Sequence, residues 1–252
     1  TLDVAKEELK NAAIQNTNKK KEIIKDIIDL IGLNNLDMPS NIIDLIKTNK
    51  LKHRLAFFVG NVNELGGLNR VVLQIAGQLC DDYDIYLILF EKPNGLGYLY
   101  DRRIKEIVFP FIYVEEDYRE KLVKILKLLD IDIFICSHNC SNVYLNLYPK
   151  LNQYNIKSIA WNHEFYFMPY WNSQFHDCLI IKNEALSQAS VSVWLNSFSA
   201  NIYAFSYSNA AIIPNPVTVK LPDIIDNVKK RSKIILAVGR FDDPQKGLFD
   251  LL

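Results

Sequence analysis

Short runs of β-branched and apolar residues alternate with helical stretches from residue 51 onward, and this alternation most constrains the fold. The β-rich runs cover residues 55–59, 85–90, 131–136, 157–161, 191–195 and 211–213. Between them, over 68–79 and 122–129, apolar residues recur every three or four positions, which is the spacing of one helix face. Strands that are buried on both faces and joined by helices form parallel sheets. We therefore predict an α/β fold, a Rossmann-like parallel sheet with helices on both faces.

A further candidate strand lies in 104–114, although Pro110 cannot donate a hydrogen bond to a sheet. We expect three regions in the chain. Residues 1–50 are predicted to form a helical extension or linker, and 51–218 an N-terminal Rossmann-like domain. Residues 219–252 are predicted to be a linker and the start of a second domain, since their last part has the pattern of a strand, a loop and the first turn of a helix.

The chain begins at Thr1 and stops inside that βα pattern, so we expect it to be part of a longer polypeptide. A strand and half a helix cannot bury their apolar faces alone. The remainder of that polypeptide is thus an expected partner.

Charge and cysteine content exclude several classes of protein. The 29 basic and 29 acidic residues balance, so no positive field attracts nucleic acid. The four cysteines form no CxxC pair, which favours a reducing cytoplasm over a secreted, disulfide-linked protein. No apolar run approaches the length of about 18 residues that indicates a membrane span. The run Lys19 to Lys21 leaves peripheral contact with a membrane surface open, beside the favoured interpretation of a solvated helix face.

Ligands of parallel sheets bind where the strands end, and three such positions carry candidate residues. Gly66 and Gly67 stand directly before the helix that follows the first strand, where glycine permits positive φ and close approach of a ligand to the backbone. A plain turn is the alternative. His138 follows the strand over 131–136, and Asn162 and His163 follow the next strand.

A metal site built from His138, His163, Cys136 and Cys140 is disfavoured. Their spacing matches no zinc pattern, and Cys136 belongs to a strand, where we expect it to be buried. We predict no metal and no cofactor. The alternative for His138 is that it caps a helix or packs in the core.

Three motifs, taken together, resemble those of a known family. GGLNRVV at 66–72, NAAIIPNPV at 209–217 and ILAVGRFDDPQKG at 235–247 are similar to signatures of the retaining family-4 glycosyltransferases. The resemblance covers 55–252 and implies a GT-B architecture, in which the first Rossmann-like domain binds the acceptor and the second binds the nucleotide sugar. It also implies a metal-independent transferase with retention of configuration.

The resemblance assigns roles to residues at matching positions. Arg240 and Lys246 match the pair that binds the diphosphate, and His163 matches a histidine near the transferred sugar; these three are the candidate catalytic residues. The candidate substrate-binding residues are Gly66, Gly67, Arg70, His138, Asn162, Tyr166 and Trp171.

The chain departs from the family at two points. Pro216 stands where the interdomain signature usually has glycine, which stiffens the backbone. No glutamate follows Arg240, so the family's Glu-x7-Glu motif of the donor domain is not in this sequence. We expect the chain by itself to be inactive as a transferase.

The acceptor is left open between a saccharide, a lipid-linked sugar and another molecule. Five aromatic residues lie within 165–171, and aromatic rings either stack on sugars or pack in the core. Synthesis of cell-surface polysaccharide or glycoconjugate at the inner face of the membrane is a setting that the family implies. The alternatives are a non-catalytic GT-B-like binding or scaffolding domain and a GT-B sugar-nucleotide epimerase.

Overall fold

The computed structural model of this chain describes residues 50–108, 117–137, 147–164, 166–167 and 178–217. The expected helical extension before residue 50 and the expected start of a second domain after 218 lie outside the described residues.

The sheet confirms the predicted fold class. Its strands are β1 (Arg54–Gly60), β2 (Asp84–Leu89), β3 (Lys105–Val108), β4 (Ile133–Cys136), β5 (Lys157–Asn162), β6 (Val191–Trp194) and β7 (Ala210–Ile212). They form one seven-stranded sheet in the order β3-β2-β1-β4-β5-β6-β7, and every neighbouring pair is parallel. The predicted β-rich runs therefore all belong to strands, and the candidate strand in 104–114 is present as β3.

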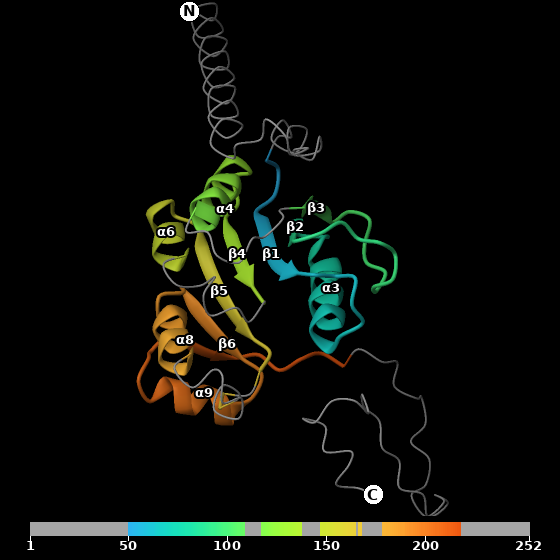
Figure 1. The fold of residues 1–252 in the computed structure, drawn as a ribbon. Helices are drawn as coiled ribbons and strands as arrows, with labels where there is room; N and C mark the ends of the chain where they lie inside the picture. Colours follow the sequence, from blue (N-terminus) through green and yellow to red (C-terminus); the bar gives the residue numbers. More distant parts are fainter. Residues whose placement is uncertain (1–49, 109–116, 138–146, 165, 168–177, 218–252) are drawn as a thin grey trace, which may run out of the picture. The chain divides into compact units, whose positions relative to one another are not determined.

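Helices cover both faces of this sheet (Figure 1). They are α3 (Gly67–Leu79), α4 (Asp117–Leu128), α6 (Leu147–Gln153), α8 (Cys178–Ser187) and α9 (Ser197–Ala204). Buried residues of α3 belong to one core cluster, whereas those of α4, α6, α8 and α9 belong to the other. The chain is thus a Rossmann-like three-layer structure with α3 on one face of the sheet.

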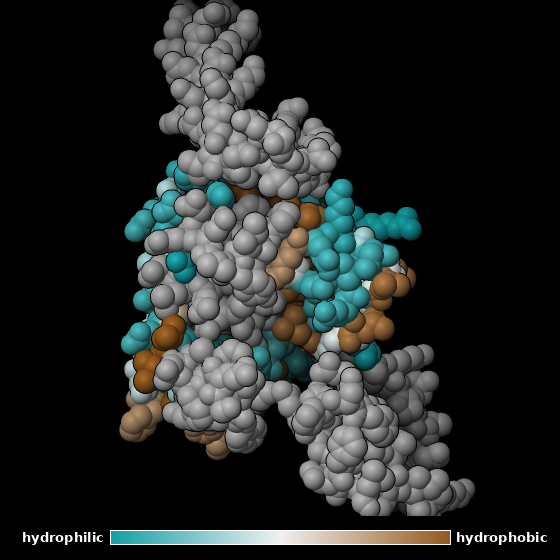
Figure 2. Space-filling model, in the orientation of Figure 1, coloured by the Kyte–Doolittle hydropathy of each residue, from teal (hydrophilic) through white to brown (hydrophobic). Residues whose placement is uncertain are grey.

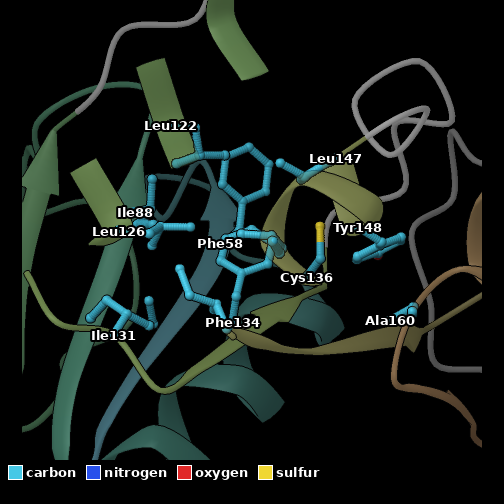
Figure 3. Close-up of a cluster of buried hydrophobic side chains, with 14 of the residues drawn as sticks. Phe58, Ile88, Leu122, Leu126, Ile131, Phe134, Cys136, Leu147, Tyr148 and Ala160 are labelled. Carbon is cyan, nitrogen blue, oxygen red and sulfur yellow. The ribbon is translucent and has the colours of Figure 1, made fainter. Parts of the chain in front are cut away.

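Strand β1 lies in the middle of this arrangement, and all seven of its residues are buried. Phe57 packs in the cluster on the α3 side, and its neighbour Phe58 packs in the opposite cluster. Figure 3 shows Phe58 among Leu122 and Leu126 of α4 and Phe134 of β4. Because successive side chains of a strand point to opposite faces, a strand covered on both sides is apolar throughout.

The amino end of β1 carries a buried charge. Arg54 is 1% exposed, and its Nη1 donates to the carbonyl oxygen of Leu129 at 2.7 Å. Its backbone amide donates to Oδ2 of Asp132 at 2.8 Å. Burial would raise the pKa of Asp132, but hydrogen bonds from Lys50 and from the Arg54 amide lower that pKa below its usual value. These contacts attach β1 to the segment before β4 at the edge of the sheet opposite to the candidate site.

No helix in the described ranges has the length and apolar character needed to cross a membrane.

Candidate functional site

The strand order reverses between β1 and β4, and this reversal locates the candidate site. From β1 the chain adds β2 and β3 on one side and then β4 to β7 on the other. Open parallel sheets bind ligands outside the carboxyl ends of the strands at such a switch point. At this point Ser137, the residue after β4, donates through its Oγ to the carbonyl oxygen of Phe58 at 3.0 Å. The two strand ends that bound the crevice are therefore joined directly.

The loop between β1 and α3 is held in shape by Asn69. This residue is 7% exposed, and its Nδ2 donates to the carbonyl oxygens of Asn61 at 2.8 Å and Glu64 at 2.9 Å. Asn69 was not predicted to fix this loop. Its place in the GGLNR motif at 66–70 is the sequence signal that could have indicated it.

The backbone conformation of the glycine pair at the start of α3 differs from expectation. Gly66 is the N-cap of α3 with φ −137° and ψ 156°, an extended conformation, and the positive φ of this loop occurs at Gly60, with φ 84°. The expectation of positive φ at Gly66 is therefore wrong. A Cβ at Gly66 or Gly67 would have no heavy atom within 4 Å, and no side chain caps the helix. Open space thus adjoins the first amides of α3, which is suitable for an anionic ligand.

The loop after β2 supports the loop after β1. Asn63 Nδ2 donates to Oε1 of Glu91 at 3.1 Å, and the amide of Asn94 donates to Oδ1 of Asn63 at 2.8 Å. A Cβ on Gly97 would lie 1.9 Å from the carbonyl oxygen of Val62. Only glycine fits this close approach, which fixes the two loops against each other at the carboxyl edge of the sheet.

Arg70, a predicted substrate-binding residue, lies in the first turn of α3. It contributes to a groove of about 570 Å³ along that helix, whose opposite wall is formed by residues 98–101. Figure 2 shows hydrophobic surface on the side of the molecule that carries α3 and the loop after β2. The most exposed apolar side chains of these loops are those of Leu65, Leu96 and Leu99.

His163 directly follows β5 and is partly buried. Its ring centroid lies 4.5 Å from that of Trp161, with an interplanar angle of 47°. Burial lowers the pKa of His163 to about 4, so the imidazole is neutral near pH 7. Within the described part of the chain, its Nε2 is buried without a hydrogen-bond partner. A neutral imidazole can donate or accept a hydrogen bond.

Asn162, also predicted to bind substrate, is used inside the sheet. It is 2% exposed, and its Nδ2 donates to Oγ of Ser192 and to the carbonyl oxygen of Val193, both at 3.1 Å. These bonds attach the end of β5 to β6. The structure gives Asn162 a role in holding the backbone that leads into His163, and its amide nitrogen is not directed to the crevice.

Tyr166 packs against the core side of the same turn. Its ring lies 5.6 Å from that of Trp194 and 5.0 Å from that of Phe167. Its hydroxyl accepts a hydrogen bond from Nδ2 of Asn183 at 2.9 Å. The contacts of Tyr166 and Phe167 are thus those of aromatic rings that pack against other side chains.

Four predicted site residues lie outside the described residues: His138, Trp171, Arg240 and Lys246. Cys136 is 1% exposed in β4, as expected. Among the residues that the structure describes, no group of three or more His, Cys, Asp and Glu side chains could hold a metal ion.

Three of the described candidates, Gly66, Gly67 and His163, come after the carboxyl ends of strands at the same edge of the sheet. Gly66 and Gly67 follow β1, His163 follows β5, and β4 lies between these two strands. Because neighbouring strands are about 4.8 Å apart, the ends of β1 and β5 are separated by about 10 Å.

No protein-family model and no curated protein sequence matches the chain. Its fold is similar to that of Anabaena Alr3699/HepE in complex with UDP and glucose, at a TM-score of 0.50 and 16% identity, over 65% of this chain and 44% of that one. The structure of Anabaena Alr3699/HepE in complex with UDP-glucose gives a TM-score of 0.50 at 15% identity with the same coverage. The chain thus spans less than half the length of these structures. The likeness agrees with a Rossmann-like α/β fold.

The close approach at Gly97 generates a stability prediction. Gly97→Ala places a methyl group against the Val62 carbonyl, and we expect the free energy of unfolding to fall by about 1–3 kcal/mol, the usual cost of overpacking. Gly67→Ala is the control: its Cβ has open space and alanine favours a helix, so stability should stay equal or rise. Urea unfolding followed by circular dichroism measures both. Equal stability of the wild type and Gly97→Ala would contradict the steric argument.

The lowered pKa of His163 generates a pH prediction. The unfolded imidazole binds a proton with a pKa near 6.5 and the folded one with a pKa of about 4, so the stabilisation is complete above pH 6.5 and is lost as the pH falls from 6.5 to 4. Through His163 alone, the free energy of unfolding should be about 2 kcal/mol lower at pH 5 than at pH 7. His163→Gln should remove that part of the pH dependence. Urea unfolding of both proteins at pH 5 and pH 7 tests this. If the free energy of unfolding changes with pH by the same amount in the wild type and in His163→Gln, His163 is not the group responsible.

Proposed function

We propose that this chain supplies the acceptor-side domain of a GT-B glycosyltransferase of the retaining family-4 type. Its donor would be a nucleotide sugar. The observation that carries the proposal is the placement of the GGLNR glycines and of His163 at one edge of a parallel sheet, beside its switch point. The fold likeness to a protein solved with UDP-glucose supports it.

The proposed reaction assigns a task to each group. The acceptor hydroxyl replaces the diphosphate at the anomeric carbon of the sugar, and negative charge grows on the leaving phosphate oxygens. Free amides at the start of α3 favour such an anion. Arg240 and Lys246, through the motif that they share with the family, would supply the cationic charge. No metal or cofactor is required by this scheme.

His163 would contact the transferred sugar. Its neutral imidazole has a buried nitrogen without a hydrogen-bond partner in the described residues. A sugar hydroxyl can satisfy this nitrogen without bringing a charge into the site. Fixed hydrogen bonds to a reacting sugar contribute to the rate when they strengthen in the transition state.

The acceptor would be a saccharide, a lipid-linked sugar or a related molecule. The reaction would belong to the synthesis of cell-surface polysaccharide or glycoconjugate. We place the enzyme in the cytoplasm, with peripheral contact at the inner face of the membrane. Incubation of the longer protein that contains this chain with a panel of radiolabelled nucleotide sugars, with and without acceptor extract, tests the function. If the protein neither transfers sugar to an acceptor nor hydrolyses any donor, the proposed function is refuted.

Replacing His163 should reduce the rate strongly. In the longer protein, His163→Ala should lower the transfer rate by about a hundredfold, because a positioned polar contact to the reacting sugar is lost. His53→Ala is the matched control, since the His53 side chain is 75% exposed at the opposite edge of the sheet, and it should keep the wild-type rate. Initial rates with saturating donor measure the effect. Equal rates for wild type and His163→Ala would leave only a packing role.

Replacing Arg240 tests the proposed metal-free stabilisation of the leaving group. Arg240→Ala should lower the catalytic constant by two to three powers of ten, about 3–4 kcal/mol, the size of one preorganised donor. Arg240→Lys should restore part of that loss, because an ammonium lacks the two-pronged geometry of a guanidinium. Rates in EDTA should equal those without it. Loss of transfer on chelation, or full activity of Arg240→Ala, would overturn the scheme.

A further inference from the structure

The turn that follows β5 is attached to helix α8 at two points. We refer to His163, Glu164, Tyr166 and Phe167 as the post-β5 turn. Lys182 of α8 donates through Nζ to Oε2 of Glu164 at 3.2 Å. The next residue of the helix, Asn183, donates through Nδ2 to the hydroxyl of Tyr166 at 2.9 Å. Two consecutive helix residues thus hold the turn that carries the proposed catalytic histidine.

The attachment through Lys182 is made by a buried charge. The side chain of Lys182 is 8% exposed, whereas that of Glu164 is 39% exposed. Removing an ammonium group from water costs several kcal/mol unless a carboxylate compensates it. The two charges of a fully exposed ion pair would instead be solvated by water when the pair separates, at little cost in free energy. The buried lysine therefore favours one position of the Glu164 carboxylate over all others.

The residues before His163 are fixed in a similar way. The amide of Asn162 is bonded to β6 at 3.1 Å, and the ring of Trp161 lies against the imidazole. His163 is thus bracketed by a neighbour tied to the sheet and a neighbour tied to α8. The imidazole itself makes no hydrogen bond through Nε2 within the described part of the chain. Among the described residues, these bracketing contacts are the ones that orient the imidazole.

We propose that Lys182 is a positioning residue for His163, which acts by holding Glu164 and with it the post-β5 turn. This inference rests on the proposed function in one respect, that His163 contacts the transferred sugar. Lys182 itself touches no substrate in this scheme. Asn183 assists it through Tyr166 at the other end of the turn.

The ion pair also places a carboxylate in the residue next to His163, with an ammonium bound to it, while the lowered pKa of His163 itself comes from burial. A carboxylate beside an imidazole favours its protonated form, whereas an ammonium disfavours it. Of the elements described around this turn, β6 and α9 bring the uncharged side chains of Trp194 and Ser199. With Lys182 bound to Glu164, the two charges compensate each other. Without Lys182, the carboxylate is uncompensated and free to approach the imidazole.

The test follows the proton binding of His163 by NMR in the 252-residue chain. The sequence has four histidines, and His163→Gln identifies the signal. In Lys182→Met we expect the proton binding constant of His163 to rise at least about tenfold, the scale for an added neighbouring carboxylate. Lys182→Arg should restore it to near the wild-type value.

Two matched controls separate positioning from a general loss of stability. Lys150 forms the same kind of pair with Glu120, at 2.8 Å between α6 and α4, and Lys150→Met should leave His163 unchanged. The signal of His53 serves as an internal control in every variant. A folded Lys182→Met protein with an unchanged His163 titration would overturn the proposal.

A second variant applies if Lys182→Met does not fold. The double variant Lys182→Met/Glu164→Gln removes both charges of the pair, so that no uncompensated buried charge remains and the protein should fold while losing the ion pair. Amide hydrogen exchange at residues 163–167 should then accelerate by about tenfold or more, with exchange in β1 unchanged. Unaltered exchange at the turn would refute the positioning role. Neither measurement uses a sugar donor, so failure of this inference and failure of the proposed transferase function are distinguishable.

Discussion

The burial of β1 between two helical layers is the constraint on which the rest of the structure depends. All seven residues of β1 are buried, and the strand is paired with β2 on one side and β4 on the other. Between Arg54 and Gly60 its backbone is paired on both sides within the sheet, and the side chains of residues 55–59 pack in the two apolar clusters. Polar chemistry can begin only where the strand ends, at Gly60. The candidate site lies at that edge because the interior of the sheet excludes it.

The fold was predictable because its central elements carry strong local patterns. Strands such as β1 and β2 are continuous runs of apolar and β-branched residues, and α3 repeats its apolar residues with helical spacing. The burial of Arg54 was not predictable in this way. A charged residue at the start of a strand is usually solvated, whereas here the carbonyl of Leu129, 75 positions later in the sequence, and the carboxylate of Asp84 compensate it. Such partners are set by tertiary packing.

The candidate site was predictable in position but not in its supporting contacts. The sequence placed the glycine pair and His163 at strand ends, because strand ends follow from the apolar runs. Lys182 gave no signal, since a lysine in a short helix normally faces solvent. Its partner Glu164 lies 18 residues earlier in the sequence. The conformation of the loop after β1 was also not predicted. Its positive φ belongs to Gly60, and side-chain bonds from Asn69 to the carbonyls of Asn61 and Glu64 hold the rest of the loop.

The alternation of side chains along a strand explains why Asn162 and His163 differ although they are neighbours. Asn162 is the last residue of β5, and its amide still bonds to β6 within the sheet. His163 is the first residue beyond the ladder, so its ring is held by packing on Trp161 while Nε2 has no partner in the described residues. Burial then keeps this imidazole neutral near pH 7. A neutral nitrogen at the end of a strand suits hydrogen bonding to a hydroxyl better than binding of a phosphate. The amides at the start of α3 are better suited to a phosphate. The two candidate groups are thus chemically different, because one is a neutral nitrogen and the other a helix end that favours an anion.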